Sequence, residues 1–92
     1  MIRVIDDFYI EVETSPCINY VVRRGEGIRD EKSRNRDKII GYGKDMTNAL
    51  EMIRAQIIAL RLERDLPTVA EALQAIREEN RRFTNMLAEF TA

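Results

Sequence analysis

The sequence predicts an α+β fold: a small antiparallel β-meander of three to four strands, then two α-helices, the second long and amphipathic. Short β-branched and aromatic runs recur up to residue 42. No connection before residue 45 is long enough for a crossover helix. Apolar residues then recur at helical spacing. Ninety-two residues form a single domain, with a sheet half at 1–44 and a helical half at 45–92.

Four segments are expected to form the strands. Residues 3–5 are β-branched, and Asp6-Asp7 suits a tight turn. Residues 8–13 alternate between two faces. One face is expected to carry Phe8, Ile10 and Val12, and the other Tyr9, Glu11 and Glu13. After a break at 14–16, residues 18–24 form the next strand, with Ile18, Tyr20 and Val22 on one side. Residues 38–42 form the last strand.

Two helices follow. Asp45 is a plausible N-cap for the first, and the apolar stripe that follows Met46 is wide enough for burial on two sides. Pro67 ends this helix. Thr68 and Glu71 form a capping box for the second helix. That helix is expected to run to about Phe90, roughly 33 Å.

The segment Gly25–Asp37 is predicted to be an exposed loop. Residues 23–38 have a net charge of +3, against −3 for residues 1–22. Arginine forks suit phosphate or carboxylate, so this region is a candidate anion-binding edge. Tyr20 and Tyr42 could stack on a base there. The candidate ligand residues are Arg23, Arg24, Arg29, Lys32, Arg34, Arg36, Tyr20 and Tyr42. The alternatives are a solvated loop and half-buried tyrosines.

The second helix also carries a candidate oligomer interface. Val69, Ile76, Phe83 and Phe90 stand seven apart, and Glu79 and Asn80 interrupt the seam. The interface residues are expected to be Ile76, Phe83, Met86, Leu87 and Phe90. Packing inside one subunit is the alternative. Arg54 and Arg61, seven apart on the first helix, either line a groove or lie on a solvated face.

Composition excludes several chemistries. The chain has no histidine and one cysteine, so it offers no imidazole-based catalytic set, no internal disulfide and no usual zinc site. Cys17 is expected to be half-buried near a turn. Adjacent carboxylates in Asp6-Asp7 and Glu78-Glu79 point in different directions and form no acid/base dyad. With no signal peptide, membrane span or cofactor motif in view, we expect a non-enzymatic, cytoplasmic protein without cofactor.

Several runs together resemble a known group of proteins. They are Asp7-Phe8-Tyr9-Ile10, Asn19-Tyr20-Val21-Val22, Ile40-Gly41-Tyr42, and Ala49-Leu50 opening a helix. This pattern is similar to small uncharacterised proteins encoded by phages and prophages of Firmicutes. The resemblance implies a mobile-element accessory protein in the host cytoplasm, and it implies no activity.

Two functions are therefore expected. The first is a phage-encoded, non-enzymatic binding protein that inhibits host antiviral defence, either by binding a CRISPR effector or by sequestering a nucleotide immune signal. The alternative is a small nucleic-acid-associated regulator using the basic loop 23–38, although a net charge of −1 argues against a bulk nucleic-acid binder. Either protein is expected to form a homo-oligomer, a dimer or higher.

Overall fold

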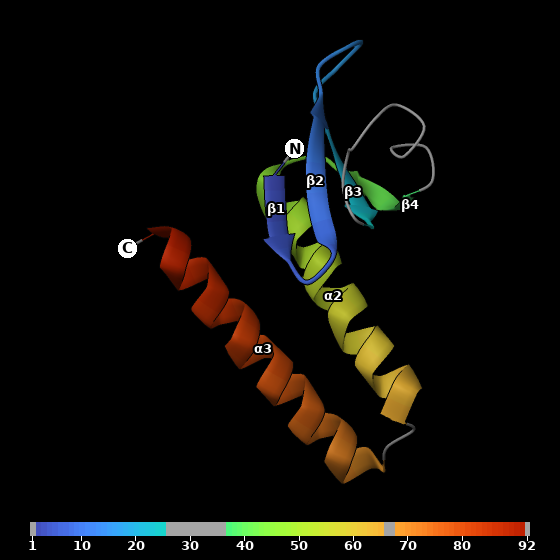
Figure 1. The fold of residues 1–92 in the computed structure, drawn as a ribbon, viewed down its shortest axis with the longest axis vertical. Helices are drawn as coiled ribbons and strands as arrows, with labels where there is room; N and C mark the ends of the chain where they lie inside the picture. The colour runs from blue at the N-terminus through green and yellow to red at the C-terminus, as the bar shows by residue number, and fades with distance from the viewer. Residues whose placement is uncertain (1, 26–36, 66–67, 92) are drawn as a thin grey trace. The chain divides into compact units, whose positions relative to one another are not determined.

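A computed structural model describes residues 2–25, 37–65 and 68–91, with side chains up to residue 89 (Figure 1). Its strands are β1 (Ile2–Ile5), β2 (Phe8–Glu13), β3 (Asn19–Arg24) and β4 (Lys38–Gly43). Its helices are α2 (Met46–Asp65) and α3 (Val69–Thr91). The α+β fold is confirmed. The strands lie within residues 1–44 and the helices within 45–92, and the chain divides by its internal contacts into two compact units, Met1–Ile53 and Arg54–Ala92.

The sheet of the first unit is the expected meander. Its strand order is β1-β2-β3-β4, and every neighbouring pair is antiparallel. Asp6, in the turn between β1 and β2, has a φ of 53°. The register shifts between Arg3 and Ile5 in the first pair and between Val22 and Arg23 in the last. Bulges of this kind protect the outer strands against pairing with another sheet.

One face of the sheet packs on the first turns of α2. Gly41 lies opposite Val22, and Gly43 lies opposite Tyr20. A Cβ atom on Gly41 would lie 3.1 Å from the Met52 sulfur, and one on Gly43 would lie 2.9 Å from the Ala49 amide nitrogen. The two glycines therefore let the helix approach β4 closely. Ile10, Val22, Ala49 and Ile53 are fully buried in the core of this unit.

On the sheet face opposite α2, Tyr9 and Glu11 are buried, whereas Val12, on the face that packs on α2, is 46% exposed. Glu11 can be buried because Arg23 neutralises it, with 3.4 Å between Nε of Arg23 and Oε1 of Glu11. Val12 lies near the end of β2, next to the 14–18 connection where Ile18 is also exposed.

Both helices begin with side-chain caps. Oδ1 of Asp45 accepts a 2.7 Å hydrogen bond from the Asn48 amide, which confirms the expected N-cap of α2. The Glu71 amide donates to Oγ1 of Thr68 at 3.3 Å, as expected at the start of α3. The carboxylate of Glu71 accepts from the Thr68 hydroxyl at 3.1 Å and not from the Thr68 amide. Pro67 lies outside the described residues, and α2 ends at Asp65.

Because β4 contacts α2, a side chain is tolerated less well at Gly43 than at Gly41. We expect Gly43→Ala to lower the free energy of unfolding by about 1–3 kcal/mol, the usual cost of overpacking a core, because the new methyl meets helix backbone. Gly41→Ala is the matched control, since its methyl meets the flexible end of Met52. Denaturant unfolding monitored by circular dichroism measures both. Equal losses in the two variants would contradict this packing.

Candidate functional site

The structure describes four of the eight residues expected to bind an anion or a base. They are Tyr20, Arg23, Arg24 and Tyr42. The other four, Arg29, Lys32, Arg34 and Arg36, lie outside the described residues.

Arg23 belongs to a buried polar cluster on the sheet face opposite α2. Besides its ion pair with Glu11, its Nη1 donates to the Asp37 carbonyl at 3.3 Å. The Tyr9 hydroxyl donates to Oδ2 of Asp37 at 2.6 Å. Burial first, and then this hydrogen bond, raise the pKa of Tyr9 above its ordinary value of 10.0. The guanidinium of Arg23 thus already has partners inside the protein, and its expected role as an anion ligand stays a prediction.

Arg24 also has partners within the chain, on the sheet face that packs on α2. Its Nε lies 3.1 Å from Oδ2 of Asp7, and its guanidinium carbon is 5.7 Å from the centre of the Phe8 ring. The amide of Gly25 donates to the Asp7 carbonyl at 2.8 Å. These contacts hold the end of β3 against the turn between β1 and β2. Arg24 and Asp7 are both partly exposed, so their ion pair contributes little to stability.

The two candidate tyrosines lie on opposite faces of the sheet. Tyr20 pairs with Gly43 on the face that packs on α2, and it is half-buried. Tyr42 pairs with Val21 on the opposite face, and it is 57% exposed. One bound base therefore cannot stack on both rings, and a binding role for either tyrosine stays a prediction.

Strand β4 does offer an exposed apolar surface. Ile39 pairs with Arg23 and Tyr42 with Val21, so both side chains lie on the face opposite α2. Ile39 is 42% exposed. We call Ile39 and Tyr42 the β4 surface. Tyrosine is enriched at protein contacts, because its ring presents a large apolar area at low cost in conformational entropy.

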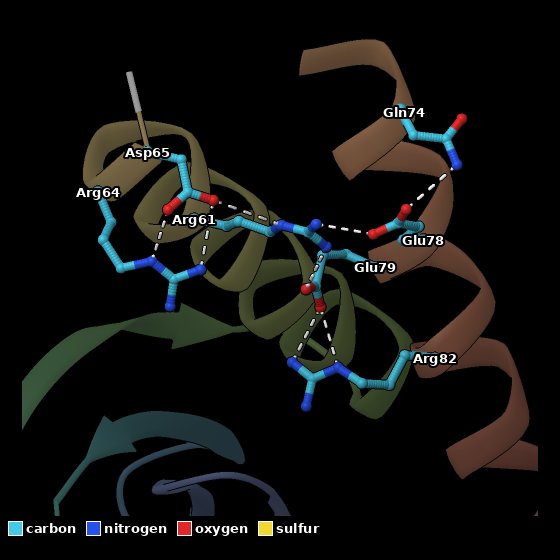
Figure 2. A network of polar contacts seen from close by, with 7 residues as sticks. All are labelled: Arg61, Arg64, Asp65, Gln74, Glu78, Glu79 and Arg82. Carbon is cyan, nitrogen blue, oxygen red and sulfur yellow. Dashed lines mark hydrogen bonds and ion pairs between the residues drawn. The ribbon is translucent and has the colours of Figure 1, made fainter. Parts of the chain in front are cut away.

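The second unit is held by a network around Arg61 (Figure 2). Nη2 of Arg61 donates to Glu78 at 2.7 Å, and Nη1 donates to Glu79 at 3.0 Å. Nε lies 3.8 Å from Oδ2 of Asp65. Arg82 also binds Glu79, at 2.9 Å. The adjacent carboxylates Glu78 and Glu79 thus converge on one guanidinium that joins the end of α2 to α3.

Arg54, seven residues before Arg61 on α2, also binds a side chain of α3. Its Nη1 donates to Oδ1 of Asn80 at 2.7 Å. Arg54 and Arg61 are half-buried and bind side chains of α3, so the expectation of a solvated face is wrong. Arg61 also lines the hollow described next, so the expectation of a groove stays a prediction. Their partners include Glu79 and Asn80, the two residues that interrupt the apolar seam of α3. That polar pair, set against two arginines seven apart, was the sequence signal for the contact.

A hollow of about 250 Å³ lies beside this network. Its lining residues are Arg61, Leu62, Asp65, Glu71, Gln74 and Ala75. Its charged groups already have partners: Asp65 binds Arg64 at 2.8 Å, and Glu71 binds Thr68. The arrangement is therefore suited to holding the two helices together.

The expected oligomer residues are largely covered within a single chain. Phe83 is 4% exposed, and Ile76, Met86 and Leu87 are half-buried. The side chain of Phe90 lies outside the described residues. The large exposed apolar residues of α3 are instead Val69, at 79%, and Leu73, at 49%. Self-association stays a prediction, and its central residue Phe83 is already buried.

The remaining candidate groups give no site. Cys17 is exposed, so its expected half-burial is wrong. Within residues 2–25, 37–65 and 68–91, no cluster of acidic or cysteine side chains could hold a metal ion. None of the helices in these same ranges is long and apolar enough to cross a membrane.

The Arg61 network predicts a specific dependence on pH. Arg61, and then Gln74, lower the pKa of Glu78 below its ordinary 4.5, and Arg64 and Arg61 lower that of Asp65. Carboxyls with a lower pKa in the folded state stabilise it above their unfolded pKa and lose this effect as the pH falls. We expect Arg61→Gln to lower the melting temperature by about 5 °C at pH 7 and by less at pH 3.

Thermal unfolding monitored at 222 nm measures this effect. Arg77→Gln is the matched control, because Arg77 is exposed on the same unit and makes no ion pair with a described residue. If Arg61→Gln lowered the melting temperature equally at pH 7 and pH 3, the stabilisation by Arg61 would not depend on ionised Glu78 and Asp65, which would contradict the prediction.

Comparisons with known proteins add no relative. No protein-family model, curated protein or solved structure matches the chain. The functional proposals below therefore rest on the chain's own sequence and geometry.

Proposed function

We propose that this chain is a non-enzymatic binding protein that contacts a protein partner through the β4 surface. The observation that carries the proposal is that Ile39 and Tyr42 are both exposed on one face of the strand, 42% and 57%. Tyrosine is enriched where proteins meet and often dominates the binding energy. The bulge between β3 and β4 disfavours pairing with a partner strand, so contact through side chains fits better.

The charges of the described residues favour a protein over an anionic ligand. Arg23 is buried against Glu11 and Asp37, and Arg24 is paired with Asp7. Neither guanidinium is available without breaking a contact. A sequestered nucleotide signal would therefore depend mainly on the basic residues of the segment 26–36, which lies outside the described residues.

The resemblance to phage and prophage accessory proteins suggests which partner. We propose a protein of host antiviral defence, such as a CRISPR effector, bound in the host cytoplasm. The alternative is a small regulator that binds nucleic acid through loop 23–38, with Lys38 exposed at its end. The two proposals predict a different dependence of binding affinity on salt concentration. Binding to nucleic acid weakens steeply as salt rises, whereas an apolar contact changes little.

A phage-plating assay in a host with active CRISPR immunity tests the proposal. Expression of the wild-type chain is expected to restore plaques, and Tyr42→Ser is expected to weaken effector binding by about tenfold or more, as loss of an interface anchor does. Ile18→Ser is the matched control, since Ile18 is 60% exposed but lies outside β4. Circular dichroism checks that both variants are folded.

Two outcomes would contradict this proposal. One is Tyr42→Ser restoring plaques as well as the wild type does. The other is a wild-type chain that leaves immunity unchanged and retains no host protein on affinity purification. Strong retention of nucleic acid at low salt, lost as salt rises, would favour the alternative.

A further inference from the structure

Helix α3 carries an apolar stripe near its start that its own unit leaves exposed. Val69 is 79% exposed and Leu73 is 49% exposed, and Ile76 is half-buried. Steps of four and three residues place these side chains in one row along about two turns. We call these three residues the α3 stripe.

Two arginines border the α3 stripe on one side. Arg77 follows Leu73 by four residues and Arg81 by eight, so they continue its row along the helix. Both are exposed, and neither makes an ion pair with any residue in the described part of the chain. Among the other arginines of this unit, Arg61, Arg64 and Arg82 each bind a carboxylate and Arg54 binds Asn80. Arg81 acts on Glu78 through its charge but makes no ion pair with it. Exposed apolar area and exposed cationic groups therefore coincide on one flank of α3.

We propose that this flank docks an acidic amphipathic helix of a protein partner. Helices recognise one another through anchors at i, i+4 and i+7, which is the spacing of Val69, Leu73 and Ile76. Glutamate or aspartate beside the partner's apolar row would pair with Arg77 and Arg81. Complementary charge at the rim of an apolar contact mainly selects the partner and its orientation.

A second copy of this chain fits the same surface poorly. An antiparallel copy related by a two-fold axis would bring the same flank of both helices together, and the row Ala70, Gln74, Arg77 and Arg81 on that flank offers no carboxylate to either arginine. A parallel copy would set that row against the opposite border of the stripe. There Phe83 is already buried and Glu79 already binds Arg61 and Arg82. The charge pattern thus favours a different, acidic chain.

This inference goes beyond the proposed function and does not rest on it. The β4 surface lies in the first unit and the α3 stripe in the second. The two surfaces also differ in chemistry, since the two arginines make the α3 flank selective for negative charge.

Two synthetic helical peptides test the proposal. Both carry leucines at i, i+4 and i+7, and they differ only in their flanking residues, glutamate in one and lysine in the other. Fluorescence anisotropy at low salt is expected to show about tenfold tighter binding of the glutamate peptide, the effect of roughly two exposed ion pairs. The preference is expected to shrink as salt rises.

Substitutions test whether the peptides bind at this flank of α3. The double variant Arg77→Glu, Arg81→Glu is expected to reverse the preference between the peptides, and Leu73→Ser to weaken binding of both. The matched controls are Lys44→Glu and Ile18→Ser, exposed residues of the first unit, which are expected to bind as the wild type does. All these side chains are exposed, and circular dichroism confirms the helices.

Four results would overturn the proposal. The first is equal binding of the two peptides by the wild type, and the second is an unchanged preference in the double arginine variant. The third is a wild-type dimer in sedimentation that Leu73→Ser dissociates, because a second copy would then be the occupant. Tyr42→Ser is expected to bind the peptides normally, which separates this test from that of the β4 surface. Loss of binding in Tyr42→Ser would move the contact to β4 and also contradict the proposal.

Discussion

The close approach of α2 to Gly41 and Gly43 is the constraint on which the first unit depends. A methyl group at Gly43 would lie 2.9 Å from the backbone of Ala49, so only a residue without a side chain lets the helix lie this near. That closeness allows Ile10 and Ile53 to be fully buried. It also decides which face of the sheet is inside. Because α2 lies on the glycine side of β4, the side chain of Tyr42 is on the other side, where a partner can reach it.

The boundary between the two units follows from a change of chemistry along α2. Up to Ile53 its buried positions are apolar and face the sheet. From Arg54 onward the helix adds arginines that bind Asn80, Glu78 and Glu79 on α3. Partly exposed ion pairs of this kind contribute modestly to stability, but their directed donors favour one alignment of two helices over others. A seam of leucines alone would allow several registers.

Local patterns in the sequence predicted the elements better than they predicted the partners of charged residues. Spacing and caps located the four strands, Asp45 and Thr68, because each signal involves residues close in sequence. The burial of Glu11 depends on Arg23, twelve residues away on the next strand, so the alternation of residues 8–13 alone could not predict it. The partner of Arg61 lies even further along the chain, on a different helix. To predict on which face of the sheet Tyr20 and Tyr42 lie, one would likewise need the register of β3 with β4.

The charged clusters of the described residues fix neighbouring strands and helices. A general acid or base works best with a pKa near the pH of the reaction. In the part of the chain that the structure describes, the resolved shifts move groups the other way: burial and Asp37 raise the pKa of Tyr9, and arginines lower those of Glu78 and Asp65. These groups keep one charge state around neutral pH and serve to fix neighbouring strands or helices. The exposed apolar residues therefore lie around these clusters, as Ile39 and Tyr42 on β4 and as Val69 and Leu73 on α3.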